Sequence, residues 1–372
     1  MKKKAIVAGH ICLDITPKFP EGKQTDLSQI LLPGKLIQVG EADIHTGGAV
    51  ANTGLAMKIL GADVSLMSKI GRDAFGEIVC GILGQYDAAG EMIHLEREST
   101  SYSMVLAYPG TDRIFLHNPG ANDTFCADDI GLEALREADL FHFGYPPLMH
   151  SIYADDGAEL VKLFRKVKAS GCAASLDMAF PDAESGAGQA DWKKILQRVL
   201  PFTDFFVPSV EELCYMLDRP RFASWQERAA GGDVTQILEV DKDIRPLADR
   251  CMAYGAKVLL IKCGAAGIYY RTADERTLSG IGGRVELDAA AWEGQEGFER
   301  SYVPDRVLSG TGAGDTSIAA FLTAMLRGET LEECMHMAAA AGAACVSSYD
   351  ALGGLASYEE LKGRIAAGWR KQ

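Results

Sequence analysis

Short apolar runs that alternate with helical patterns constrain the fold of this chain more than any other feature. Each run has the length of a buried strand, and the segments between several runs place apolar residues at helical spacing. Such alternation is typical of βαβ units, in which helices cover both faces of a mostly parallel sheet and ligands bind beyond the carboxyl ends of the strands. The expected strands are residues 5–8, 64–67, 140–143, 173–176, 205–207 and 258–261, and the expected helices include 76–83, 159–167 and 246–254.

Composition indicates a globular protein and excludes two classes of partner. The chain has 372 residues, of which 48% are hydrophobic and 24% charged, so it can bury a large core. Its formal net charge is −14. Because non-specific nucleic-acid binding and anionic membrane binding both need a basic face, we expect neither partner. Any anionic ligand must be held by a local arrangement of donors.

The cysteines and the N-terminus predict a soluble cytoplasmic protein. Nine cysteines, an odd number, are scattered without C-x-x-C spacing, which indicates neither a disulfide framework nor a zinc site. The start, Met1-Lys2-Lys3-Lys4, is similar to a signal peptide, but the apolar run that follows covers only residues 5–8 and is too short for export. No apolar stretch approaches the roughly 20 residues that cross a bilayer.

Some segments depart from the alternating plan. Residues 15–45 and about 98–120 contain short strand-like patches, including 101–106 and 113–117 joined by a turn at 108–112. They predict a small β-sheet that lies over the site as a lid, and a surface hairpin is the alternative. The stretches 219–243 and 273–300 are polar and weakly periodic, and we interpret them as insertions into one domain that spans 1–372.

The segment Gly310-Thr311-Gly312-Ala313-Gly314-Asp315 carries the strongest chemical signal. It precedes a helical pattern that runs from Ile318 toward Gly328. Glycines let backbone N–H groups approach an anion, and the helix dipole favours negative charge at this end. Asp315 could then accept a proton from an attacking hydroxyl. The alternative is that Asp315 only caps the helix.

Two more glycine-linked motifs predict substrate contacts. Asp14 follows the first strand, where a carboxylate can accept hydrogen bonds from sugar hydroxyls. Gly47 and Gly48 precede Asn52, whose amide lies on the inward face of the next helix and needs partners. Asp73, between two further glycines, is expected to cap a helix.

Acidic groups follow two other expected strands. Asp177 follows one strand, and Glu211 and Glu212 follow the next. Carboxylates near a phosphate site usually imply Mg²⁺, and isolated acids are more often solvated. The chain contains no P-loop, dinucleotide-binding, nucleophile-elbow or H-E-x-x-H motif.

Taken in order, these motifs resemble those of the ribokinase-like (PfkB) carbohydrate kinase family. The resemblance covers about residues 6–358. It rests on the Gly-to-Asp segment at 9–14, G-G-x-x-x-N at 47–52, G-x-D-x-x-G at 71–76, the N-x-x-E position at 209–212 and G-A-G-D at 312–315.

The resemblance implies a three-layer α/β/α sandwich with a β-sheet lid, and phosphoryl transfer from ATP with Mg²⁺ to a hydroxyl of a monosaccharide, sugar acid or polyol. It also allows a homodimer formed through the lid. The implied site residues are Asp315 as catalytic base; Gly312, Ala313 and Gly314 as the anion hole; Asp14, Gly47, Gly48 and Asn52 as substrate contacts; Thr311, Gly264 and Ser209 at the nucleotide; and Glu212 at the metal.

Departures from the family pattern define the alternatives. Ser309 and Gly310 replace an Asp and a Thr that often help to bind a monovalent cation, so we expect little or no potassium activation. Ser209 replaces the usual Asn. A nucleoside kinase is the runner-up within the family and would need an aromatic or apolar wall for the base. A non-catalytic sugar-binding sensor is the third hypothesis. The candidate wall residues are Phe19, Tyr102, Phe115 and Tyr145.

Overall fold

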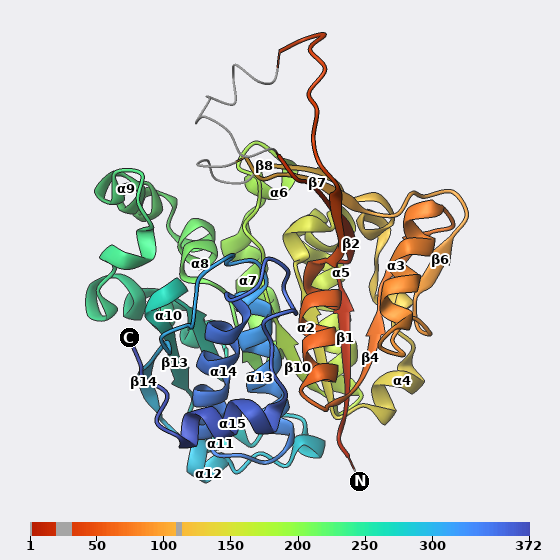
Figure 1. Cartoon of the computed structure of the whole chain (residues 1–372). Coiled ribbons are helices and arrows are strands. Elements are labelled where there is room, and N and C mark those ends of the chain that lie inside the picture. Colours follow the sequence, from red (N-terminus) through yellow and green to blue (C-terminus); the bar gives the residue numbers. More distant parts are fainter. Residues whose placement is uncertain (1, 20–31, 109–113) are drawn as a thin grey trace.

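The computed structural model describes residues 2–19, 32–108 and 114–372, and it is built around one large sheet (Figure 1). The strand order in this sheet is β14-β13-β12-β11-β10-β9-β1-β4. The strands from β12 to β4 pair in parallel, whereas β13 and β14 are antiparallel to their neighbours. The bounds are β1 Lys4–Gly9, β4 Asp63–Met67, β9 Leu140–Gly144, β10 Ala173–Leu176, β11 Phe205–Phe206, β12 Val258–Lys262, β13 Gly267–Thr272 and β14 Glu296–Arg300.

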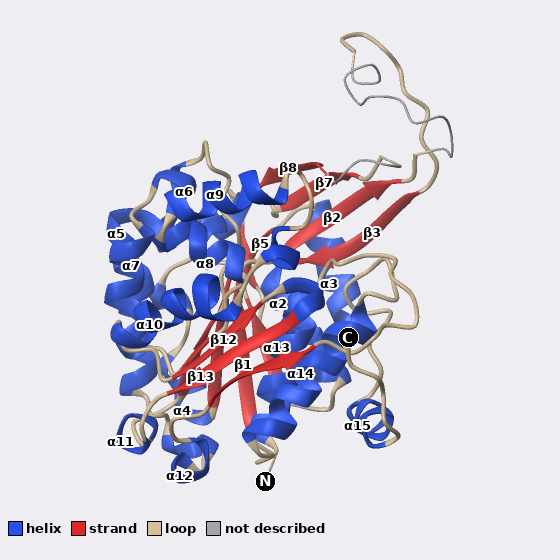
Figure 2. Cartoon of the chain, turned by 90° about the vertical axis from the view of Figure 1, so that its left-hand side faces the viewer, coloured by secondary structure: helices blue, strands red, loops and turns tan. Residues whose placement is uncertain are grey.

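Helices cover both faces of this sheet, as Figure 2 shows. Side chains alternate along each strand, so Val7 faces one core cluster and Ile6 faces the other. Helices α2, α13 and α14 pack in the first cluster, and α5, α7, α8 and α10 in the second. The helices are α2 Gly48–Ile59, α3 Ala74–Gly84, α4 Leu132–Glu137, α5 His150–Ala169, α6 Gly186–Gln189, α7 Trp192–Val199, α8 Val210–Leu217, α9 Arg219–Ala229, α10 Arg245–Ala253, α11 Glu275–Leu278, α12 Ala289–Trp292, α13 Ala313–Leu326, α14 Leu331–Cys345 and α15 Tyr358–Ala366.

A second, four-stranded sheet stands beyond the upper end of the main sheet in Figure 1. Its order is β3-β2-β7-β8, with β2 Cys12–Pro17, β3 Ala42–Gly47, β7 Tyr102–Leu106 and β8 Ile114–Asn118. Strands β5 Lys69–Gly71 and β6 Ile93–Leu95 form a separate short pair. The small sheet predicted from the two irregular segments is therefore present. Residues 20–31, the turn at 109–112 and Arg113 lie outside the described residues.

The predicted alternation is confirmed, and two strands of the main sheet, β13 and β14, were missed. All six expected strands form, and the expected helices correspond to α3, α5 and α10. The stretch 273–300, interpreted as a polar insertion, ends in β14, which completes one edge of the main sheet. In β14 only Glu299 is buried, because one edge and much of both faces are exposed. A strand of this kind carries no apolar pattern. The stretch 219–243 is also largely ordered, since it contains α9.

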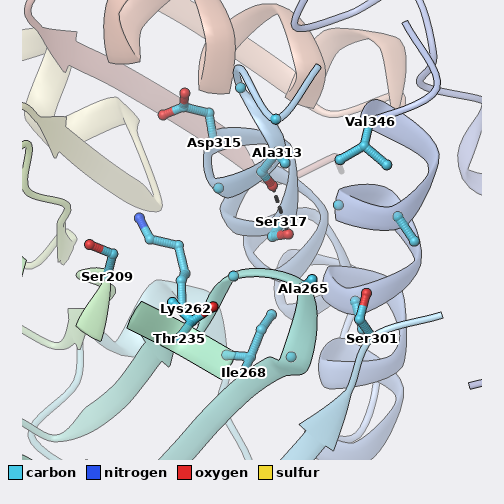
Figure 3. Close-up of a pocket in the computed structure, with 18 of the residues that line it drawn as sticks. Ser209, Thr235, Lys262, Ala265, Ile268, Ser301, Ala313, Asp315, Ser317 and Val346 are labelled. Atoms are coloured by element: carbon cyan, nitrogen blue, oxygen red, sulfur yellow. Dashed lines mark hydrogen bonds between the residues drawn. The ribbon is translucent and has the colours of Figure 1, made fainter. Parts of the chain in front are cut away.

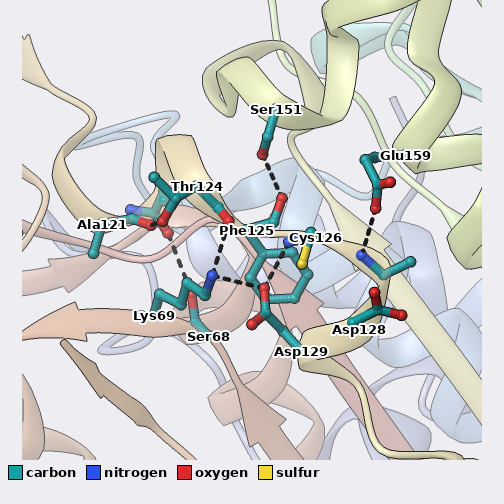
Figure 4. A network of polar contacts seen from close by, with 12 residues as sticks. Ser68, Lys69, Ala121, Thr124, Phe125, Cys126, Asp128, Asp129, Ser151 and Glu159 are labelled. Carbon is teal, nitrogen blue, oxygen red and sulfur yellow. Dashed lines mark hydrogen bonds and ion pairs between the residues drawn. The ribbon is translucent and has the colours of Figure 1, made fainter.

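A buried polar network fixes the link between the two sheets. Asn122 accepts a hydrogen bond from the Ile11 N–H (3.2 Å) and donates to the Ile11 carbonyl (2.7 Å), next to the junction of β1 and β2. Ser68 donates to the Gly9 carbonyl (2.6 Å) and to Asn122 (3.2 Å). Nearby, Lys69 donates to the Thr124 carbonyl and pairs with Asp129, both at 2.8 Å (Figure 4). The residues 9–11 that precede β2 are thus held in one conformation.

Within the described part of the chain, no helix combines the length and the apolar character needed to cross a membrane.

Candidate active site

The glycine-rich segment forms an open helix start. Helix α13 begins after Gly312, which has φ +75° and contributes no side-chain cap. A Cβ atom at Gly312 would lie 2.2 Å from the Ala351 Cβ, so only glycine fits here. The first α-helical hydrogen bond runs from the Thr316 N–H to the Gly312 carbonyl at 2.8 Å. Of the N–H groups before this bond, that of Ala313 donates to the Gly310 carbonyl at 3.3 Å, and that of Gly314 is the group that can meet an anion along the helix dipole.

Asp315 is buried beside this helix start. Its side chain is 4% exposed and accepts hydrogen bonds from two other elements. The Tyr145 hydroxyl lies 2.8 Å from both carboxylate oxygens, the Asn52 Nδ2 donates to Oδ2 at 3.0 Å, and the Thr53 hydroxyl lies 3.4 Å from Oδ1. Tyr145 follows β9, whereas Asn52 and Thr53 belong to α2. The alternative that Asp315 caps α13 is wrong, because Gly312 occupies the cap position.

A lysine that sequence analysis did not identify lies beside the same helix start. Lys262 ends β12 and donates to Asp177, which follows β10, at 2.7 Å. A Cβ atom on Gly314 would lie 3.3 Å from the Lys262 Cδ, so the glycine lets this side chain approach the helix start. Figure 3 shows Lys262 and Asp315 extending into the same pocket. The other Asp177 oxygen, Oδ2, has no hydrogen-bond partner among the residues described.

Three carboxylates act on this one ammonium group. Burial raises the pKa of Asp315, and the Lys262 charge together with the hydrogen bonds from Asn52 and Tyr145 only partly offsets it. Burial raises the pKa of Asp177 to about 8, although Lys262 opposes the shift. Burial alone would lower the pKa of Lys262, but Asp177 and Glu212 raise it, so the ammonium stays charged. The cluster holds more acid than base and therefore suits an added proton or cation.

A pocket of about 470 Å³ opens beside this cluster. Its volume is typical of small-molecule sites, and apolar side chains such as Ile268 and Val346 form part of its wall (Figure 3). Thr311 is not in the lining, and its hydroxyl accepts a hydrogen bond from Ser309 at 3.0 Å. The predicted site residues that do line the pocket are Ser209, Glu212, Gly264, Gly312, Ala313, Gly314 and Asp315.

Ser209 and Glu212 form the start of α8. The Ser209 N–H donates to the Glu212 carboxylate at 2.7 Å, and the Glu212 N–H donates to the Ser209 hydroxyl at 3.3 Å. This capping box explains why serine is a suitable residue where the family pattern has asparagine. In the described ranges no three histidine, cysteine or acidic side chains are grouped so as to hold a metal. The metal role of Glu212 remains a prediction.

The predicted substrate contacts are Asp14, Gly47, Gly48 and Asn52, and none of them lines the pocket. They lie on strands β2 and β3 of the small sheet and at the start of α2. A Cβ atom on Gly47 would lie 2.1 Å from the Asp14 carboxylate, and one on Gly48 would lie 2.6 Å from the His10 ring. His10 is fully buried, and neither ring nitrogen has a partner in the described part of the structure. Burial lowers the pKa of His10, which keeps the ring neutral. Asp315 joins the two regions through Asn52.

The four candidate wall residues for a nucleoside have separate surroundings. Tyr145 packs against His10, with ring centroids 6.1 Å apart. Phe19 contacts Tyr108 instead, and Tyr102 contacts Phe75. Phe115 is 55% exposed on β8.

Lys262, His10 and Thr53 are the residues of this site that sequence analysis missed. Lys262 had a usable signal, because a charged residue at the carboxyl end of a buried strand, two residues before Gly264, faces the ligand edge of the sheet. Tyr145 was considered only as part of an aromatic wall.

Comparison with known proteins agrees with this geometry. Residues 9–356 match the pattern of the family described as "pfkB family carbohydrate kinase". An uncharacterised sugar kinase from Archaeoglobus fulgidus is 23% identical over 301 residues, which is 81% of this chain and 98% of the relative. Arabidopsis thaliana ribokinase, solved with ribose and ATP, superposes with a TM-score of 0.68, 21% identity and 98% coverage of both chains. A Xylella fastidiosa fructokinase with bound ATP gives a TM-score of 0.71, 19% identity and 99% coverage of both. These structures confirm the predicted fold.

Proposed function

The chain belongs to the pfkB family of carbohydrate kinases, and from this premise we propose that it transfers the γ-phosphate of ATP to a hydroxyl of a monosaccharide, sugar acid or polyol. Proteins of this family are phosphotransferases. One observation carries the proposal: the buried Asp315 carboxylate lies at an uncapped helix start beside a pocket that also contains Lys262.

Each group has a separate task in this mechanism. Asp315 accepts the proton of the substrate hydroxyl. The hydroxyl oxygen bonds to the γ-phosphorus of ATP while the bond from this phosphorus to the bridging oxygen breaks and ADP leaves. The N–H groups of Gly312 and Gly314 and the Lys262 ammonium stabilise the negative charge on the transferred group, whereas the Ala313 N–H is held by the Gly310 carbonyl. Asp14, Gly47, Gly48 and Asn52 hold the sugar. Gly264 and Ser209, which line the pocket, bind the nucleotide, whereas Thr311 lies outside the lining. Phosphoryl transfer depends mainly on such positioning and charge.

The acidic surplus supports Mg²⁺ as the metal. The unpartnered oxygen of Asp177 and the carboxylate of Glu212 are hard oxygen ligands of the kind that Mg²⁺ prefers. Glu212 would organise the ion and its waters, and the bound ion would neutralise charge on the phosphates. The altered Ser309 and Gly310 support an enzyme with little need for potassium.

The small sheet and the cysteines support three further parts of the proposal. We expect the sheet to close over the sugar and exclude water, which otherwise competes for the phosphate.

Consecutive exposed side chains on β8, Ile114, Phe115 and Leu116, support a homodimer through this sheet. All nine cysteines are free, as expected in the reducing cytoplasm. Sedimentation of the protein with and without a Phe115→Ser substitution tests the dimer.

A substrate screen tests the proposed activity. ADP release from ATP is measured with monosaccharides, sugar acids, polyols and nucleosides, with and without Mg²⁺ and K⁺. We expect Mg²⁺-dependent turnover with at least one carbohydrate and its loss in an Asp315→Asn variant. Turnover confined to nucleosides would favour the nucleoside kinase. Carbohydrate binding without turnover would favour the sensor.

A further inference from the structure

Tyr145 contacts the proposed base through its hydroxyl. The phenol oxygen lies 2.8 Å from Oδ1 and 2.8 Å from Oδ2 of Asp315, so its single proton can be donated to either carboxylate oxygen, one at a time. Burial and then the Asp315 charge raise the pKa of Tyr145 well above its usual value. The hydroxyl therefore stays a neutral donor at physiological pH.

The backbone at Tyr145 is held in a conformation that aromatic residues rarely adopt. Its φ is +65° and its ψ is +46°, in the left-handed region. Strain of this kind costs on the order of 1–3 kcal/mol and is concentrated at functional sites. Gly144 before it packs closely on α2, since a Cβ there would lie 2.1 Å from the Ala49 Cβ. Pro146 and Pro147 follow, so the chain on both sides leaves Tyr145 little freedom to move away.

The acceptor positions of Asp315 are nearly filled by protein donors. An ionised carboxylate offers about four lone-pair positions. Asn52 uses one on Oδ2, Thr53 uses one on Oδ1, and the single Tyr145 proton uses one on either oxygen. About one position is left, which is enough for the proton of one substrate hydroxyl.

We propose that Tyr145 is a positioning residue for phosphoryl transfer, whose hydroxyl holds the Asp315 carboxylate so that its remaining lone pair faces the acceptor hydroxyl. This role rests on the kinase activity proposed above. Lys262 carries the charge that acts most strongly on Asp315. Without the Tyr145 donor, we expect the carboxylate to turn toward that ammonium and away from the substrate.

The other ionisable groups that face Asp315 come from four elements. They are Lys262 at the end of β12, Asp177 after β10, Glu212 on α8 and Cys345 on α14. Burial raises the pKa of Cys345 to about 11, so its thiol stays neutral. All four groups remain in a Tyr145→Phe variant. A change in the titration of Asp315 then reports the lost hydroxyl.

Kinetics of Tyr145→Phe test the proposal. Phenylalanine keeps the ring and its packing on His10 and removes only the donor. We expect kcat to fall roughly ten-fold because the base is misaligned, with the KM for the carbohydrate changed less than about two-fold. Loss of a hydrogen bond to the ionised form raises the pKa of Asp315, so the acid limb of kcat/KM should move upward by about one pH unit. A Tyr254→Phe variant, at the end of α10 and outside the pocket lining, serves as the matched control.

A higher kcat in Tyr145→Phe would overturn the proposal, because it would mean that the hydroxyl occupies the place of the substrate. An unchanged kcat and pH profile would overturn it too. Thermal melting provides a readout that does not depend on turnover. The melting-temperature shift of the double variant should differ from the sum of the Tyr145→Phe and Asp315→Asn shifts by at least about 1–2 °C. If the wild-type enzyme is active and the melting-temperature shifts of the two variants are additive, this inference alone is refuted. If the shifts are coupled but the wild-type protein shows no turnover, the proposed function is refuted together with the role built on it.

Discussion

Replacement of Asp315 by asparagine should separate catalysis from stability. Asparagine has the same shape, and its carbonyl can still accept hydrogen bonds from Tyr145 and Thr53. Asn52, which now donates to Oδ2, can turn its own amide and accept from the new NH₂ group. Lys262 keeps its 2.7 Å bond to Asp177. The substitution therefore removes one buried negative charge and leaves its donors satisfied.

The two expected effects have opposite signs. Without a base to accept the hydroxyl proton, the rate constant for phosphoryl transfer should fall by roughly 10²–10⁴-fold, or about 3–5 kcal/mol in the barrier. Stability should rise. Burial raises the pKa of Asp315, so the folded protein binds this proton more tightly than the unfolded chain does. The stabilisation from this bound proton is complete below about pH 4, the pKa of Asp315 in the unfolded chain. It is lost as the pH rises through the pKa of Asp315 in the folded protein.

We therefore expect the variant to be more stable than wild type at pH 7–8, by on the order of 1–2 kcal/mol, and to lose this advantage toward pH 4. Single-turnover kinetics, carbohydrate binding and melting curves across pH measure the three quantities. Near-normal turnover would refute the role of Asp315 as base. Lost turnover together with a lower melting temperature at pH 8 would refute the electrostatic reasoning, because the change would then act through the fold.

Three further predictions follow from the charges around the pocket. Glu212→Gln should impair catalysis more at low than at high Mg²⁺, because a neutral side chain holds the ion's shell less firmly, and an equal loss at all Mg²⁺ concentrations would contradict this. Lys262→Met should lower kcat/KM for ATP by roughly 10²–10³-fold. The variant should still fold, because Asp177, with its pKa raised to about 8, can hold a proton at neutral pH. An unfolded variant, or unchanged kinetics, would show the reasoning to be wrong. Activity at constant ionic strength should be nearly equal in K⁺ and Na⁺, because Ser309 and Gly310 supply no carboxylate, and a large increase with K⁺ would count against this.

Local patterns predicted most of the fold. Buried strands such as 258–261 are continuous apolar runs because both faces of the sheet are covered, and this signal is independent of the rest of the chain. The edge strand β14 was missed because it has few apolar contacts. Asp73 was correctly expected to cap a helix, and it accepts a hydrogen bond from the Gly76 N–H at 2.8 Å. Such caps are local and can be read from a few residues.

The sequence by itself determined most of the elements and the glycine-rich helix start with Asp315 in its first turn, since each depends on neighbours along the chain. Only the tertiary structure decided what surrounds that carboxylate. Asn52 and Tyr145 are 263 and 170 residues away from Asp315 in sequence, and Lys262 is 85 residues from Asp177. Hydrogen bonds, burial and charge act through space over a few ångströms, whereas a sequence pattern reports only on residues close in the chain. For this reason the roles proposed for Tyr145 and Lys262 could be inferred only from the structure, in which strands β9 and β12 end at a common edge of the sheet.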